Sequence, residues 1–290
     1  MQLTLEHITK SYTKGKKRKN ALEDFTLTLT EGVYGLLGPN GAGKSTLINI
    51  ITGIIGKDSG SIAFSDGGDN SFLSHLGFMP QGMDFYRNFT AKDYIKYIMA
   101  LKKYSPDNAD EYALSVLDRV NLHSDADKKI GAFSGGMKQR LGIAQAIVGE
   151  PKVLIFDEPT AGLDVEARNE ILDLLRDYAA EDENRTILIT SHIASDLEHL
   201  CDDIYLIHGG KQLLHEETDV ILEQYGLIKA DEAQYAALDK EYLLGSRKEP
   251  YGYACLTNDR KYYEENVPDL VVERAGIDDV ILMMTGGEKR

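Results

Sequence analysis

A run of small residues that ends in a lysine and two hydroxyl side chains has the composition of a phosphate-binding turn. Two glycines, Gly38 and Gly43, are separated by four residues, and Lys44 follows directly. The complete run is Gly38, Pro39, Asn40, Gly41, Ala42, Gly43, Lys44, Ser45 and Thr46. Glycine lets backbone N–H groups approach phosphate oxygens, Lys44 can reach the outer phosphates, and the Ser45 hydroxyl can bind Mg2+. The run therefore predicts a site for a di- or triphosphate, and a plain glycine-rich turn is the alternative.

Two acids and a histidine follow other apolar stretches. Asp157 and Glu158 come directly after Val153–Phe156, and His192 comes soon after Thr186–Thr190. Carboxylates can hold Mg2+ and activate a water molecule, and histidine can act on a neighbouring phosphate. A solvated pair of acids and a structural histidine are the simpler alternatives. We favour chemical roles because the carboxyl ends of parallel strands meet at one edge of a sheet.

Apolar patterning predicts the elements that would position these side chains. Val33–Leu37, before the glycine run, is expected to be a buried strand, and Leu47, Ile48 and Ile51 after it mark one face of a helix. Strands and helices alternate further along the chain, which is typical of a mostly parallel sheet with helices on both faces. The predicted fold class is therefore α/β, with a P-loop nucleotide-binding core.

Residues 3–29 predict an antiparallel part, made of two half-buried strands. Tyr12 lies on the first strand and is either an ordinary strand aromatic or a ring that stacks on a base. The basic run Lys14–Lys19 joins the strands. It is either a solvated hairpin tip or a contact with anionic lipid.

Residues 83–149 predict a helical subdomain inserted between two strands. Gln81 lies just before it, on a loop after the strand Leu76–Met79. Ser134 is placed as the N-cap of a helix that begins with Gly135 and Gly136. This Ser-Gly-Gly segment is either a capped turn or a second helix start that faces a phosphate.

Composition limits the classes of function. The net charge is -15, which argues against binding along a nucleic-acid backbone. Cys201 and Cys255 are the only cysteines and have no metal-like spacing, so a reducing cytoplasm is the simplest setting. No apolar run approaches the roughly 20 residues of a membrane-spanning helix, and the N-terminus lacks the layout of a signal peptide. We expect another chain to cross any membrane that this protein serves.

Taken in order, these motifs resemble those of the nucleotide-binding subunit of ATP-binding cassette (ABC) transporters. The resemblance covers about residues 1–214 and includes the family's short motifs in the family's order. They are the aromatic Tyr12, the phosphate loop Gly38–Thr46, Gln81, the signature Ser134-Gly135-Gly136, Leu154–Glu158, Ala161–Asp164 and His192.

The resemblance implies a role for each side chain in binding and hydrolysing ATP with Mg2+. Tyr12 would stack on adenine. Asp157 would support Mg2+ through water, Glu158 would orient and deprotonate the attacking water, and His192 would hold the γ-phosphate. Gln81 would sense the metal and the water and report to a membrane partner. The phosphates and the metal would be held by Gly41, Gly43, Lys44, Ser45 and Thr46.

The signature implies a second copy of the chain. In this family, Ser134, Gly135 and Gly136 complete the site of a partner, so that a head-to-tail homodimer encloses two ATP molecules with Asp164 near the seam. The family usually has glutamine at the fifth signature position, where this chain has Met137, as many members of the exporter branch do. The difference concerns a polar contact to the opposing nucleotide's sugar. Pairing with a different ATPase chain is the alternative to a homodimer.

The implied function is an ATPase that powers a separate membrane permease, in export, from the cytoplasmic face of the cell membrane. No nucleic-acid partner is expected. The alternative is a soluble ABC ATPase that acts on nucleic acid, ribosomes or cluster assembly. It is disfavoured because the chain is acidic, has one cassette and has no coiled-coil insertion.

Residues 215–290 lie outside the motifs and predict a small α+β appendage. A helix is expected near Val220–Tyr225, a strand at Tyr251–Leu256 and a last helix around Ile277–Leu282. The end of the chain resembles the tail of exporter-branch ATPases. The appendage is either a packing and dimer-support module or a regulatory one.

Overall fold

A six-stranded sheet forms the centre of the structure, a computed structural model that describes residues 2–15, 17–65 and 72–286. The sheet is parallel except where its last strand runs antiparallel to its neighbour. In spatial order its strands are β5 (Leu76–Met79), β6 (Val153–Asp157), β7 (Thr186–Ser191), β3 (Gly32–Leu37), β8 (Asp203–His208) and β9 (Lys211–Glu217). β6 and β7 are buried at every residue, as expected for parallel strands that are covered on both faces. The predicted α/β fold class is confirmed.

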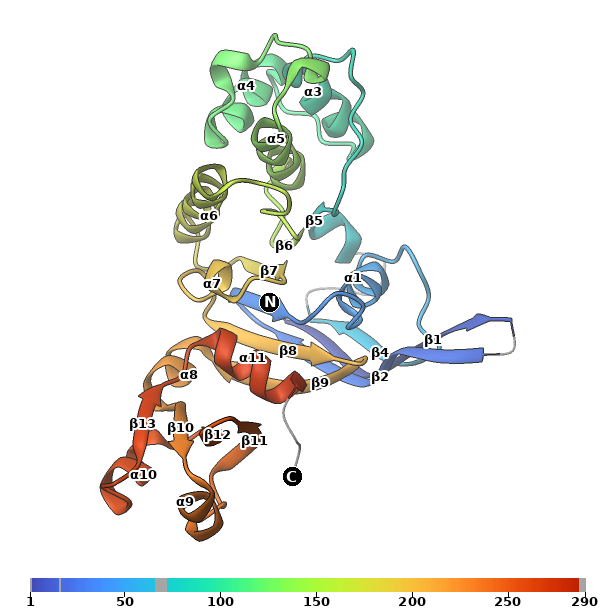
Figure 1. Ribbon diagram of the computed structural model, residues 1–290. Helices are drawn as coiled ribbons and strands as arrows, with labels where there is room; N and C mark the ends of the chain where they lie inside the picture. Colours follow the sequence, from blue (N-terminus) through green and yellow to red (C-terminus); the bar gives the residue numbers. More distant parts are fainter. Residues whose placement is uncertain (1, 16, 66–71, 287–290) are drawn as a thin grey trace.

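A separate three-stranded sheet, in the order β2-β1-β4, carries the N-terminal hairpin. Its strands are β1 (Leu3–Lys14), β2 (Lys17–Leu29) and β4 (Ser59–Phe64). The antiparallel pairing predicted for residues 3–29 is confirmed, and Tyr12 pairs with Lys19 close to the hairpin tip. Figure 1 shows this hairpin extending away from the rest of the molecule. Lys16 in the basic run lies outside the described residues, so contact of the tip with lipid stays a prediction.

The predicted helical region contains α3 (Ala91–Leu101), α4 (Ala109–Arg119) and α5 (Gly135–Ile147). It forms one end of the molecule, at the top of Figure 1. Thr90 caps its first helix, because its side chain accepts a hydrogen bond from the backbone N–H of Asp93. This bond satisfies one of the donors left free at the start of α3.

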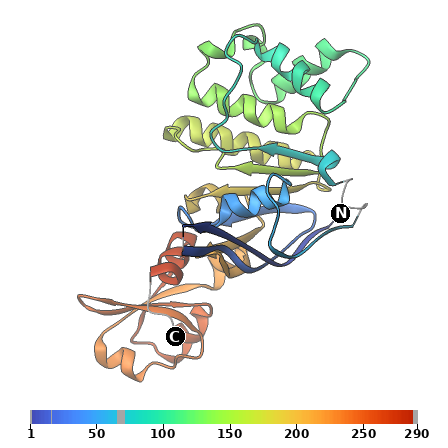
Figure 2. The same ribbon diagram turned by 90° about the vertical axis from the view of Figure 1, so that its right-hand side faces the viewer.

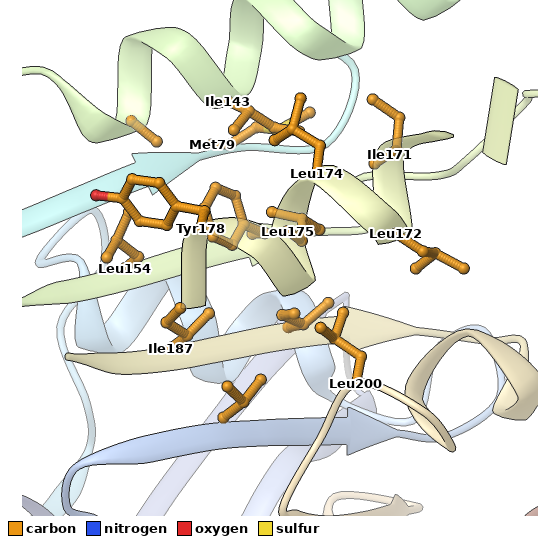
Figure 3. Close-up of a cluster of buried hydrophobic side chains, with 14 of the residues drawn as sticks. Met79, Ile143, Leu154, Ile171, Leu172, Leu174, Leu175, Tyr178, Ile187 and Leu200 are labelled. Atoms are coloured by element: carbon orange, nitrogen blue, oxygen red, sulfur yellow. The ribbon is translucent and has the colours of Figure 1, made fainter. Parts of the chain in front are cut away.

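Helix α6 (Val165–Ala180) joins this region to the central sheet. Its buried side chains, including Leu175 and Tyr178, lie between Ile143 of α5 on one side and Leu154 and Ile187 of the sheet on the other (Figure 3). The apolar face formed by Ile171, Leu172, Leu175 and Tyr178 is thus the face that packs. Burial of this face fixes the two loops that flank α6, one after β6 and one before β7.

The C-terminal part has a topology of its own. A four-stranded antiparallel sheet in the order β11-β12-β10-β13 is built from a β-α-β-β-α-β sequence of elements. This is the arrangement of ferredoxin-like folds. The elements are β10 (Gly226–Ala230), α9 (Glu232–Ala237), β11 (Leu243–Glu249), β12 (Gly252–Thr257), α10 (Arg260–Asn266) and β13 (Val271–Arg274). The helix and strand expected near 220–225 and 251–256 are present as α8 (Thr218–Gln224) and β12.

The last described helix, α11 (Ile277–Gly286), packs against both the C-terminal sheet and the central part of the chain. It lies between that sheet and the central one in Figures 1 and 2. Ile277 and Val280 belong to the same buried cluster as Leu256 of β12 and Leu197 of the short helix α7 (Ala194–Leu197). One buried cluster therefore continues from the central part into the C-terminal part, which also has a separate cluster around Ile228 and Tyr263. A division of the chain at residue 214 stays a prediction, since strand β9 continues to Glu217.

The part of the chain that the structure describes contains no helix with the length and apolar character needed to cross a lipid bilayer.

Candidate active site

The turn between β3 and helix α1 (Lys44–Ile51) forms the floor of a pocket of about 290 Å³. The pocket gathers side chains from the N-terminal hairpin, from this turn, and from the loops after β5 and β6. Its lining consists of Tyr12, Lys19, Ala21, Pro39, Asn40, Gly41, Ala42, Gly43, Lys44, Ser45, Thr46, Gln81 and Glu158. Most of the residues predicted to bind a nucleotide are therefore in one place.

The turn lies so close to its neighbours that side chains cannot be added at two of its positions. A Cβ atom on Gly38 would lie 2.2 Å from the carbonyl oxygen of Ile207, and one on Gly43 would lie 2.6 Å from that of Ala21. Gly43 also has a φ of 123°, which L side chains rarely adopt. The turn is held in this position by a hydrogen bond of 2.8 Å from the Gly210 backbone N–H to the carbonyl oxygen of Ala42.

Helix α1 begins at this turn without a side-chain cap. Gly43 is its N-cap residue and has no side chain that could satisfy the backbone N–H groups of the first turn. These groups and the positive end of the helix dipole face the pocket, so an anion in the pocket would satisfy them. The geometry fits the phosphates of a nucleotide.

Lys44 supplies a positive charge at the floor of the pocket. Its side chain is 7% exposed, its Nζ donates to the carbonyl oxygen of Gly38, and the same nitrogen lies 3.4 Å from Oε1 of Glu158. Gly38 does not line the pocket and acts here as an acceptor for the lysine. A charged donor held in this way can bind a phosphate oxygen without a large loss of side-chain entropy.

Glu158 lies between Lys44 and the predicted histidine. Its side chain is 5% exposed, and Oε2 lies 2.6 Å from Nδ1 of His192. The backbone of Glu158 has a φ of 53°, in the left-handed region. Such a conformation costs of order 1–3 kcal/mol for a residue other than glycine and often marks a functional site. Glutamate and histidine are thus brought together as the sequence predicted.

Thr190 connects the two acids and was not predicted from the sequence. Its hydroxyl donates to Oδ1 of Asp157 at 2.6 Å and accepts from the backbone N–H of Glu158 at 2.9 Å. Thr190 is the register partner of Asp157 in the neighbouring strand β7. Its place at the end of a buried strand was the one available signal.

Asp157 is buried in this arrangement, at 6% exposure. Burial raises the pKa of its carboxyl group, and the negative charge of Glu158 adds to the increase. The hydrogen bond from Thr190, the charge of Lys44 and a backbone hydrogen bond from Gln81 act in the opposite direction and lower the pKa. A cation beside Asp157 would therefore stabilise its charged form.

The oxygen atoms near the turn suit Mg2+. Ser45 and Gln81 line the pocket, whereas Asp157 precedes the lining residue Glu158 in the chain and does not itself line it. Mg2+ prefers oxygen ligands and is often held by one or two carboxylates together with substrate phosphates. The residues present fit a nucleotide with its magnesium ion.

The signature residues lie apart from this pocket. Ser134 caps α5, with its Oγ accepting from the backbone N–H of Met137 at 3.2 Å, and neither it nor Gly135 or Gly136 lines the pocket. Added Cβ atoms on the two glycines would face Leu163 and Ala167 at ordinary contact distances. Asp164 caps the adjoining helix α6. Within one chain the signature and the phosphate turn are therefore separate.

Comparison with known proteins supports an assignment to a family. The ABC transporter family model matches residues 22–161. The lantibiotic transport ATP-binding protein SrtF of Streptococcus pyogenes is 38% identical over 220 residues, covering 75% of this chain and 91% of that protein. The linearmycin resistance ATP-binding protein LnrL of Bacillus subtilis (strain 168) is 36% identical over 224 residues, covering 75% of this chain and 70% of that protein.

A solved structure agrees with these relatives. A dimeric ATP-binding cassette in a post-hydrolysis state, bound to ADP and Pi, superposes with a TM-score of 0.66 at 25% identity, covering 74% of this chain and 98% of that one. The fold of this chain is therefore that of an ATP-binding cassette. The chain belongs to the ABC transporter family, as an ATP-binding subunit that hydrolyses ATP.

Proposed function

We propose that this chain is the ATP-hydrolysing subunit of an exporter whose membrane-spanning permease is a separate chain. The observation that carries the proposal is the contact of Glu158 with both Lys44 and His192 beside the glycine turn. The names of relatives at 36–38% identity refer to lantibiotic transport, linearmycin resistance and Nod factor export. An ATPase that acts on nucleic acid, ribosomes or cluster assembly is not favoured by these relatives.

In the proposed reaction the chain mainly positions ATP and stabilises charge. Lys44 and the backbone N–H groups of the turn bind the β- and γ-phosphates. Glu158 accepts a proton from the attacking water, and His192 orients the glutamate and holds the γ-phosphate. Ser45, Gln81 and Asp157 would hold Mg2+, which neutralises negative charge on the phosphates when it is bound.

The separate position of the signature supports a head-to-tail homodimer. Ser134, Gly135 and Gly136 form an open helix start that does not reach the pocket of its own chain. In the proposed dimer, this helix start faces the γ-phosphate bound by a second copy, and Asp164 lies near the seam. ATP then links the two copies, and hydrolysis releases them.

We propose that Gln81 senses the metal and the attacking water and transmits their presence to the permease. It is exposed, lines the pocket, and begins the connection between β5 and the helical region. The protein would lie at the cytoplasmic face of the cell membrane through this contact, without binding nucleic acid.

The permease proposal is tested by affinity purification from detergent-solubilised membranes in the presence of ATP. A multispanning membrane protein should co-purify with the chain in equal amounts. Recovery of ribosomes or DNA without a membrane protein would contradict the proposal.

Tyr12 gives a smaller, local prediction. The residue is 48% exposed and lines the pocket, so its ring is available to stack on adenine. Tyr12→Ala should raise the Kd for ATP about 3- to 10-fold, since a stacked aromatic pair contributes roughly 0.5–1.5 kcal/mol. Tyr12→Phe retains the ring and should bind ATP normally in a fluorescent-nucleotide titration. Normal binding by Tyr12→Ala would show that the tyrosine is an ordinary strand aromatic.

A further inference from the structure

Asp196 is a buried carboxylate close to the active site that none of the motifs includes. It lies on helix α7, shortly after His192, and is 2% exposed. Taking a carboxylate out of water costs several kcal/mol unless charged and polar partners compensate for the lost hydration. The partners of Asp196 therefore indicate what role this buried carboxylate has.

Three side chains from three segments of the chain bind this carboxylate. The Thr160 hydroxyl donates to Oδ2 at 2.7 Å, and the Ser191 hydroxyl lies 3.2 Å from the same oxygen. The guanidinium group of Arg168 contacts Oδ1 through Nε and Nη2. Both nitrogens contact the same oxygen, and a hydrogen bond between a guanidinium group and a carboxylate is strong because both groups are charged.

Two of these partners lie close in the chain to residues of the proposed reaction, and the third lies close to the proposed seam of the dimer. Thr160 lies on the loop after Glu158, and Arg168 lies in the first turn of α6 after Asp164. Ser191 directly precedes His192, and its Oγ also accepts from the backbone N–H of Ile193 at 3.0 Å. Asp196 binds Ser191, which precedes His192, and itself lies on helix α7, which follows His192. The turn through His192 is therefore held on both sides.

We propose that Asp196 is a positioning residue that holds the loop of Glu158 and the loop of His192 at their working distance. The proposal rests on the roles given above to those two residues. Asp196 does not line the nucleotide pocket, so it acts through the contact of 2.6 Å between His192 and Glu158. Its bond to Arg168 extends the same support to Asp164, at the proposed seam of the dimer.

The proposal is tested with Asp196→Asn, which retains the size of the side chain but removes its charge. The kcat for ATP should fall about 100-fold, because small displacements of catalytic groups have effects of that size. The KM and the Kd for ATP should stay unchanged, because the phosphate turn does not contact Asp196. A matched control is Asp173→Asn, which removes an exposed carboxylate that also pairs with an arginine, Arg176. It should hydrolyse ATP at the wild-type rate.

A double-mutant cycle separates positioning from a general contribution to folding. Single-turnover hydrolysis would be measured for Asp196→Asn in the wild-type background and in a His192→Ala background. If Asp196 acts through His192, the substitution should have little further effect when the histidine is absent. Equal losses in both backgrounds, or a wild-type kcat for Asp196→Asn alone, would overturn the proposal.

A milder variant covers the case in which Asp196→Asn does not fold. Thr160→Val removes one of the donors to Asp196 with almost no change in shape, and it should lower kcat by a smaller factor with the same dependence on His192. If Thr160→Val lowered kcat by the same factor with and without His192, the result would again contradict a positioning role for Asp196. If the role proposed for Glu158 is itself wrong, a Glu158→Gln variant would hydrolyse ATP normally. This result distinguishes an error in the proposed reaction from an error in the role of Asp196.

Discussion

Glu158→Gln is expected to lower the rate of ATP hydrolysis about 10²- to 10⁴-fold, the usual range for loss of a general base. Glutamine has the size of glutamate and can still form a hydrogen bond with His192, but its amide cannot accept the proton of the attacking water. Binding of ATP depends on Lys44 and the glycine turn, which the substitution leaves in place. Phosphate release and nucleotide binding would be measured on the same preparation.

The same variant should also accumulate as a dimer. If ATP links the two copies and hydrolysis releases them, blocked hydrolysis should leave an ATP-dependent dimer that size-exclusion chromatography detects. The control is Glu183→Gln, which changes an exposed carboxylate that does not line the pocket. Turnover of Glu158→Gln at the wild-type rate would show that another group is the base.

Lys44→Ala is expected to weaken the binding of ATP itself. The lysine is the buried positive charge at the floor of the pocket, and a hydrogen bond to a charged group contributes about 1.5–3 kcal/mol. The Kd for ATP should therefore rise about 10- to 100-fold. The substitution also removes the positive charge beside the buried Glu158. The Glu158 carboxylate would then repel the phosphates more strongly.

Calorimetric titration with ATP and with adenosine separates the two contributions to binding. Lys44→Ala should bind adenosine as the wild type does, because the nucleoside carries no phosphate. Lys211→Ala, which removes an exposed surface lysine paired with Glu23, is the matched control and should bind ATP normally. Unchanged ATP affinity in Lys44→Ala would place the phosphates elsewhere.

The sequence was most informative where function constrains short segments. The strand Val33–Leu37, the glycine turn and the start of α1 are local features, and their residue types alone predict their geometry. The same holds for the cap at Ser134, which needs only a serine before a helix. The pairing of Glu158 with His192 required one further step, that the ends of neighbouring parallel strands meet.

What the sequence did not reveal depends on contacts between distant segments. Thr190 and Asp196 acquire their partners only when β6, β7 and α6 pack together; only its place at the end of a buried strand marks Thr190, and no local pattern marks Asp196. The C-terminal topology was missed for a similar reason. β11 contains glycine, serine and charged residues and has an intermediate burial pattern, so only its pairing with β12 makes it a strand.

Helix α11 also has a consequence for biosynthesis. It is translated after every other element that the structure describes, and its Ile277 and Val280 share a core with Leu197, on the helix just beyond His192. During synthesis, the β-strands and the phosphate turn can form while this apolar surface is still uncovered. The segment that carries the histidine thus obtains its full packing only once α11 has left the ribosome, so a chain truncated before α11 would be a poor ATPase.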